Sequence, residues 1–271
     1  MADIAFQASL VPASRTEDAL SASLPPALQN DRLDTISTFP SYHRARRLLE
    51  NLIVRLKPSR IADIGGGANP LIEADFVASN GLRYDVLDIS ASELAKAPEV
   101  YSKIVVDLGA QPEEFTRHVE GGAYDLVFTH MFLEHIPNPD EVHRNIRWML
   151  KPGGLAIHVF PSSANLPLTV NRLVPEPVAE ALLRIVKPRR DYAGHETKHK
   201  AYYKLCGAPS RGVRRVFDRY GFDVLRYKGF VGHSYYGRIP PLRVAEFLLR
   251  KPLAALGIPL ISGVLLIVRR R

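Results

Sequence analysis

The sequence predicts an α/β protein built on a parallel β-sheet that carries helices on both faces. Two observations support this fold class. Short apolar runs alternate with helical patterns between residues 60 and 160, as in successive βαβ units. Acids and glycines stand where the apolar runs end, and open α/β sheets bind ligands at the carboxyl ends of their strands.

The expected elements follow one another at short spacing. A helix is predicted over residues 41–56, with Ser41 as N-cap and Pro58 as stop. A second helix is predicted over 138–150, ended by the KPGG motif, and a third over 209–222. Strands are predicted over 60–64, 83–90, 102–108, 124–132, 155–160, 223–232 and 263–271.

The regular pattern is interrupted in three places. Residues 1–39 are rich in Ser, Pro and Ala, and we expect a lead segment that is partly disordered. The domain proper is expected over 40–271, with insertions at about 161–208 and 232–262. Connections of this length are usually functional, so these insertions are expected to cover and select a substrate.

The composition is that of a globular protein with a full core. The chain has 271 residues, of which 46% are hydrophobic and 24% charged. Its one cysteine, Cys206, excludes an internal disulfide framework and a multi-cysteine metal site, and is expected to be a small buried hydrophobe. An early acid at the N-terminus argues against a secretory signal, which favours a cytoplasmic location.

The stretch RIADIGGGANP, residues 60–70, leads from the first strand of this pattern into three glycines. A dinucleotide-binding loop would have a third spaced glycine where Pro70 stands, and Asp63 would repel a pyrophosphate. A ligand with an ammonium group fits better, because the Asp63 carboxylate attracts the cation directly or through water. Asn69 and Pro70 resemble the N-cap and first residue of the next helix.

Acids also end the next two strands. Asp88 stands about 20 residues beyond the glycines, where a carboxylate binds ribose hydroxyls. A helix N-cap is the plainer interpretation of Asp88. Asp107 ends the third strand, where it can accept a hydrogen bond from an exocyclic amine.

These motifs resemble those of the class I S-adenosylmethionine-dependent methyltransferases, of the kind called methyltransferase type 11. The resemblance covers residues 60–160 and rests on ADIGGGANP, YDVLDIS, VVDL and YDLVFTHMFLEHIPNPDEVHRNIRWMLKPGGLAIHVF. It implies a Rossmann-like, doubly wound sheet of seven strands, mostly parallel, whose last strand is antiparallel. It also implies S-adenosyl-L-methionine as cofactor. Asn69 stands where the common family pattern has its last glycine.

A cofactor site is therefore predicted at the carboxyl ends of the first four strands. His130 is in addition the candidate catalytic base, since histidine titrates near neutral pH. Glu134 and His135 are interpreted as fixing the turn after His130 by hydrogen bonds. The predicted cofactor-binding residues are Asp63, Gly65, Gly66, Gly67, Asp88, Ile89, Asp107, Leu108 and His130.

No metal is required by this chemistry. His195 and His199 have a helical spacing that suits a metal, but no third ligand is placed near them, so a polar segment facing the substrate is favoured. Tyr202 and Tyr203 either pack over a substrate or fill the insertion.

The predicted function is transfer of a methyl group from S-adenosylmethionine to an oxygen or nitrogen of a small-molecule, glycan or lipid-linked acceptor. An RNA methyltransferase and a non-catalytic, cofactor-binding regulatory protein remain alternatives. Nucleic acid is disfavoured, because no RNA-binding module is visible and basic residues do not interleave with aromatic ones.

The C-terminal part combines basic clusters with an uncharged stretch over 252–268, and the chain has a net charge of +8. Its length is close to the minimum of about 17 residues for a membrane-spanning helix, but Pro259 interrupts it. We predict an amphipathic helix over 243–256 and a buried strand over 263–268. The helix, flanked by Arg243, Arg250 and Lys251, predicts a peripheral contact with the anionic inner face of a membrane.

Overall fold

One mixed β-sheet forms the centre of the protein. The computed structural model describes residues 18, 22, 35–36, 42–164, 200–231, 240–256 and 260–271. The strand order is β1-β7-β8-β6-β5-β2-β3-β4, and β8 is antiparallel to both neighbours while the other described pairs are parallel. Apart from the two-residue edge strand β1, this is the doubly wound sheet of seven strands with an antiparallel last strand that the sequence predicts. The prediction is confirmed.

The elements alternate along the chain as expected. The strands are β1 (Thr35–Ile36), β2 (Arg60–Ile64), β3 (Arg83–Asp88), β4 (Ser102–Val105), β5 (Tyr124–His130), β6 (Leu150–Pro161), β7 (Phe222–Phe230) and β8 (Gly263–Arg270). The helices are α2 (Tyr42–Leu56), α3 (Ala74–Ser79), α4 (Ala91–Lys96), α5 (Pro112–Phe115), the 3₁₀ turn η2 (Leu133–His135), α6 (Pro139–Met149), α9 (Arg211–Arg219) and α11 (Pro240–Ala255). Strand β1 was not predicted, and Ser41 lies outside the described residues.

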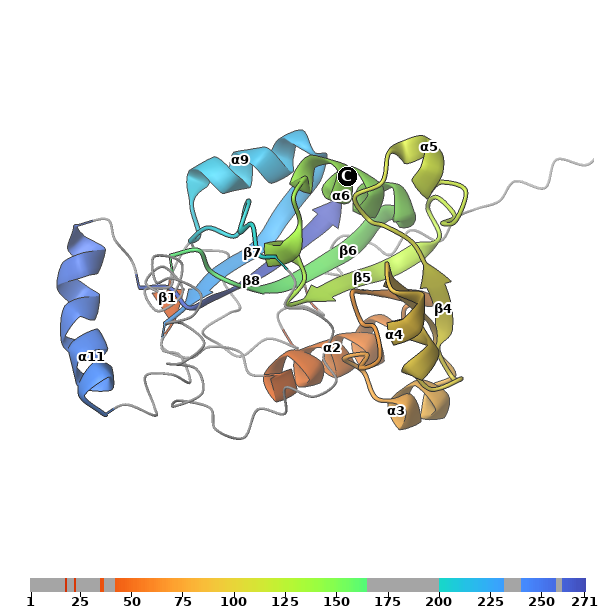
Figure 1. The fold of residues 1–271 in the computed structure, drawn as a ribbon, viewed down its shortest axis with the longest axis horizontal. Helices are drawn as coiled ribbons and strands as arrows, with labels where there is room; N and C mark the ends of the chain where they lie inside the picture. The colour runs from red at the N-terminus through yellow and green to blue at the C-terminus, as the bar shows by residue number, and fades with distance from the viewer. Residues whose placement is uncertain are drawn as a thin grey trace, which may run out of the picture.

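Helices cover both faces of the sheet and enclose two hydrophobic cores. Figure 1 shows α2 and α3 on one side of the sheet and α6 and α9 on the other. Successive residues of β8 point to opposite faces, so Leu265 packs in the core under α2 and Leu266 in the core under α6. Because both faces are covered, the whole run Val264–Val268 is buried. The prediction of a buried strand here is confirmed.

Two local predictions were wrong. Helix α3 begins at Ala74 and not at Pro70, because Pro70, Leu71 and Ile72 first pass into the core. The KPGG motif does not separate helix from strand: β6 already begins at Leu150 and is irregular opposite Tyr124–Leu126. This bulge has a structural use, since Lys151 Nζ donates to Asp125 Oδ1 at 2.8 Å.

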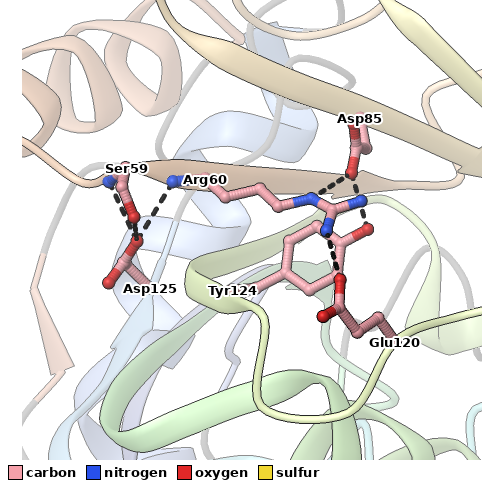
Figure 2. Close-up of polar contacts among 6 residues, drawn as sticks. All are labelled: Ser59, Arg60, Asp85, Glu120, Tyr124 and Asp125. Atoms are coloured by element: carbon pink, nitrogen blue, oxygen red, sulfur yellow. Dashed lines mark hydrogen bonds and ion pairs between the residues drawn. The ribbon is translucent and has the colours of Figure 1, made fainter. Parts of the chain in front are cut away.

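The amino ends of the strands are joined by a network of polar side chains (Figure 2). Asp85, buried in β3, accepts hydrogen bonds from Arg60 Nε and Tyr124 Oη, each at 2.7 Å. Arg60 also pairs with Glu120 at 3.1 Å. Asp125 accepts from the backbone nitrogens of Ser59 and Arg60, which fixes the start of β2 against β5. The network therefore aligns three neighbouring strands at the edge opposite the glycine loop.

This network predicts a large stability loss when the arginine is removed. Arg60→Met leaves the buried Asp85 carboxylate without its cation, which should cost about 3–5 kcal/mol of unfolding free energy. Urea unfolding followed by circular dichroism measures this. Arg55→Met, at an exposed position of α2, is the matched control and should cost less than about 0.5 kcal/mol. Equal unfolding midpoints for the two variants would contradict the assignment.

Candidate functional site

The glycine loop is held by the carboxylate that precedes it. Asp63, at the end of β2, is buried, and its Oδ2 accepts hydrogen bonds from Leu71 N and Tyr84 Oη, both at 3.0 Å. Burial and, to a smaller extent, the nearby Asp88 charge raise the pKa of Asp63, the two hydrogen bonds lower it, and the net pKa is about 7. Asp63 thus shapes the loop, and its carboxyl is only partly ionised near neutral pH.

The loop needs glycine for two different reasons. Gly65 has φ +75°, a left-handed conformation that glycine adopts without strain, and it lies against the Phe132 ring. Gly66 is limited by space, since a Cβ there would lie 2.8 Å from Val86 Cγ1 and 3.0 Å from the Asp63 carboxyl. The backbone of the loop therefore passes closely over the ends of β2 and β3.

Asp88 faces this loop from the end of β3. Its Oδ1 accepts from Ser90 N at 2.9 Å, while its Oδ2 would lie 3.3 Å from a Cβ on Gly67. The N-cap of α4 is Ser90, whose hydroxyl accepts from Glu93 N, so the plainer interpretation of Asp88 as a cap was wrong. Ile89, the next residue, is exposed although apolar. Asp88 is thus brought together with the glycines and Asp63, as predicted.

Asp107 stands two residues beyond β4 and is exposed. The backbone places it near Asp88, because Val106 N donates to Asp88 O at 2.9 Å. Its Oδ1 accepts from Gly109 N at 2.7 Å, which orders the turn. Leu108 differs from the prediction in one respect: its side chain is buried in the core and does not lie at the surface with Asp107.

Asn145 positions the turn after Asp107, although it was not among the site residues predicted from the sequence. Asn145 is buried on α6, and its Nδ2 donates to Leu108 O and Ala110 O, both at 2.9 Å. An amide within the apolar face formed by Val142, Ile146 and Met149 was the signal in the sequence, because a buried amide needs partners.

His130 ends β5, the strand next to β2. Burial lowers its pKa below the ordinary value, so the imidazole is neutral at physiological pH and able to accept a proton. The following residue, Met131, has φ +55° and is partly exposed, while its N donates to Val159 O at 2.8 Å. Strained backbone of this kind clusters at functional sites.

The turn after His130 anchors the end of the long insertion. The carbonyl oxygen of Glu134 accepts from Tyr202 N at 2.7 Å and from Tyr203 N at 3.0 Å, and His135 Nδ1 lies 3.1 Å from Lys200 O. Burial raises the pKa of the Glu134 carboxyl to about 7. These contacts agree with the interpretation of Glu134 and His135 as residues that fix the turn.

The remaining residues singled out in the sequence are either buried in the core or lie outside the described residues. Cys206 is fully buried, as predicted, and Tyr203 is partly buried against the core. His195 and His199 lie outside the described residues, as do residues 165–199 and 232–239 of the two insertions. Within the described part of the chain, no group of three or more His, Cys, Asp or Glu side chains is arranged to hold a metal.

Comparison with known proteins shows what the central part of the chain is similar to. Residues 62–156 match a family model described as a methyltransferase domain, and the sheet has the antiparallel last strand that the resemblance implies. Residues 62–156 are a class I, S-adenosylmethionine-dependent methyltransferase domain. S-adenosylmethionine is the cofactor of this domain.

Curated relatives match about half of the chain or less. The chain is 35% identical over 146 residues to a ubiquinone biosynthesis O-methyltransferase from Marinobacter nauticus, covering 51% of this chain and 59% of the relative. It is 33% identical over 111 residues to the enzyme of the same name from Xanthomonas axonopodis pv. citri, covering 39% and 45%. The chain thus spans about half the length of the curated relatives it matches.

Solved structures are also similar to the chain. One is an S-adenosylmethionine-dependent methyltransferase from Mesorhizobium loti, with TM-score 0.48 and 17% identity, covering 78% of this chain and 90% of that one. Another is a Haemonchus contortus phosphoethanolamine N-methyltransferase 2 with S-adenosylhomocysteine, with TM-score 0.46 and 16% identity, covering 78% and 48%.

The residues at this edge of the methyltransferase domain fit the cofactor. The carboxyls of Asp63, Asp88 and Asp107 suit a ligand that carries cationic groups, ribose hydroxyls and an amine. Gly66 is small because Val86 and the Asp63 carboxyl occupy the space where a side chain would stand, and this keeps the backbone of the loop close to that carboxyl. Exposed Ile89 follows Asp88 directly and offers an apolar surface next to it.

The raised pKa of Asp63 predicts a pH-dependent affinity. Since the ammonium group of S-adenosylhomocysteine favours the ionised carboxyl, binding should release a proton, and the affinity for this ligand should rise about tenfold from about pH 6 to pH 8. The stability of the fold should change with pH in the opposite direction. The raised pKa contributes stability below the ordinary carboxyl pKa of 3.8, and this is lost as the pH rises to about 7. Titration calorimetry in buffers of different ionisation enthalpy measures both affinity and proton release. The dependence should disappear in Asp63→Asn, and an unchanged pH profile in that variant would argue against this role.

Asp88 is expected to account for much of the cofactor affinity. Asp88→Ala removes hydrogen bonds to a charged acceptor and should weaken S-adenosylhomocysteine binding about tenfold to a hundredfold. Glu114→Ala, an exposed acid of α5, is the control and should bind as the wild type does. Calorimetric titration compares them, with NAD as a ligand that should not bind. Tight NAD binding without a response to S-adenosylhomocysteine would be incompatible with this site.

Proposed function

We propose that this protein transfers the methyl group of S-adenosylmethionine to an oxygen of a small-molecule acceptor. One observation carries the proposal: Asp63, Asp88 and the glycine loop lie together at one edge of the sheet. His130 ends β5, the strand that pairs with β2. Each of these groups has a use in holding the cofactor or in handling the acceptor's proton.

When bound, the cofactor would supply the methyl group of its sulfonium to the acceptor nucleophile, with S-adenosylhomocysteine as the leaving group. The protein's part is to bind, orient and exclude water. In the proposal, Asp88 accepts from the ribose hydroxyls, Asp107 from the exocyclic amine, and the glycine loop with Asp63 holds the cationic end. Asn145 positions Asp107 through the turn at Leu108 and Ala110.

Oxygen is favoured as the accepting atom for two reasons. The relatives with 33–35% identity are named O-methyltransferases. A hydroxyl must lose its proton as the new bond forms, and a neutral histidine beside the reacting atoms can accept it. The lowered pKa of His130 keeps the imidazole in this form.

We expect the insertions to select the acceptor. Residues 200–206 are fixed to the turn after His130, so this end of the first insertion lies next to the proposed base. A glycan or lipid-linked acceptor, a peripheral membrane contact through the C-terminal part, and a location at the inner face of the membrane stay predictions.

The function is tested by labelling without a preselected acceptor. Cell extract is incubated with the protein and S-adenosylmethionine labelled in its methyl group, and the labelled products are fractionated by size and polarity. Label in a small-molecule fraction as an alkali-stable ether supports the proposal. Label in RNA would favour the nucleic-acid alternative, and cofactor binding without any labelled product would favour a regulatory protein.

The proposed base gives a separate prediction. His130→Ala should lower kcat about a hundredfold or more and leave S-adenosylhomocysteine affinity nearly unchanged, because the imidazole acts on the acceptor's proton. Steady-state kinetics on the acceptor found by labelling measures the effect. His118→Ala, at an exposed position, is the control and should be fully active. A fully active His130→Ala enzyme would assign His130 to structure.

A further inference from the structure

Helix α11 exposes an apolar face. Val244, Phe247 and Leu248 are 55%, 66% and 65% exposed, and Leu256 just beyond the helix is exposed too. The first three occupy positions i, i+3 and i+4, so their side chains lie next to one another on one side of the helix. Figure 1 shows α11 at the margin of the molecule, away from the sheet. An apolar face of this kind marks an interaction surface.

The polar side chains of α11 are arranged in the reverse of the usual way. Glu246 is the one acid in the sequence of this helix, and it is only 5% exposed. Its carboxylate accepts two hydrogen bonds from Arg250 Nη2, each at 2.9 Å, and one from Arg250 Nε at 3.0 Å. The negative charge is thus paired on the inward side, while the exposed side is apolar.

Among the α11 residues whose burial the structure describes, the exposed charged residue is basic. Lys251 is exposed and stands seven residues after Val244, which places it on the same face as Val244, Phe247 and Leu248. A lysine among apolar side chains suits a bilayer surface, because its stem lies along acyl chains while its ammonium reaches the phosphates. A net charge of +8 adds a general attraction to anionic lipid.

The structure favours a surface contact over a membrane-spanning helix for the uncharged stretch over 252–268. The uncharged stretch over 252–268 is divided, since Val264–Val268 form the buried centre of β8. Among the residues that the structure describes, no helix is both long and apolar enough to cross a membrane. Among the described residues of this stretch, the exposed ones therefore lie at the end of α11 or just beyond it.

We propose that α11 lies flat on an anionic lipid surface, with Val244, Phe247 and Leu248 among the acyl chains and Lys251 at the phosphates. The proposal deepens the peripheral contact named with the proposed function by giving its residues and its lipid class. It holds for any acceptor, because no step of methyl transfer enters the argument.

Vesicle flotation of the full chain tests the proposal. The vesicles are phosphatidylcholine alone, or phosphatidylcholine with phosphatidylglycerol, each at low and high salt. The wild type should float with the anionic vesicles at low salt, less at high salt, and not with the neutral ones. No flotation with anionic vesicles would overturn the proposal.

A matched pair of variants tests the face itself. Val244→Glu in α11 and Val54→Glu in α2 change the same residue type at the same 55% exposure and alter the net charge equally. Val244→Glu should lower binding to anionic vesicles about tenfold or more, and Val54→Glu should bind as the wild type does. Lys251→Glu should also lower it about tenfold or more, with the apolar face intact. Equal binding by the two valine variants would overturn the proposal.

Two further measurements separate the competing explanations. Light scattering that shows a dimer, lost in Val244→Glu, with no vesicle binding by the wild type, would overturn the lipid proposal in favour of a second copy as partner. S-adenosylhomocysteine affinity is measured on the same samples. Flotation without cofactor binding would refute the proposed function and support this inference, and cofactor binding without flotation would do the reverse.

Discussion

The geometry of the site depends on one buried carboxyl, that of Asp63. It ties the end of β2 to β3 through Tyr84 and brings the chain back over the glycines through Leu71 N. Gly66 has to be small because this carboxyl and Val86 occupy the space where a side chain would be. A buried carboxyl is costly, and its desolvation is offset when a cation binds beside it. One residue therefore both shapes the loop and prepares it for a cationic ligand.

The acids at the two edges of the sheet have different hydrogen-bond partners. At the amino edge, the Asp85 carboxylate is buried and bound by Arg60 and Tyr124, so its charge is used to align strands. At the carboxyl edge, Asp88 uses Oδ1 for a local turn and presents Oδ2 beside Gly67, next to the surface. Arginine at one edge and backbone amides at the other thus separate structural acids from the acids that we propose bind the cofactor.

The turn after β5 joins the proposed base to the end of the first insertion. Backbone bonds to Glu134 O hold Tyr202 and Tyr203, and Met131, Tyr203 and Leu205 all have positive φ angles near +55°. Left-handed residues other than glycine are unfavourable unless tertiary contacts hold them. Their concentration around this turn indicates that tertiary contacts hold the described end of the first insertion beside the residues that follow His130.

The sequence by itself determined the fold class and the acids at strand ends, because these depend on local periodicity and on where apolar runs stop. The antiparallel last strand was implied by the resemblance. Three features needed the tertiary structure. Asp63 meets Tyr84 only when β2 pairs with β3. Asn145 on α6 reaches Leu108 in the turn after β4. The end of the first insertion meets Glu134, which lies more than sixty residues away in the sequence. The start of α3 was misplaced at Pro70 because a capping pattern was weighed without the core, which takes in Leu71 and Ile72. Periodicity identifies elements, whereas contacts between distant elements decide which polar groups are paired and which face a ligand.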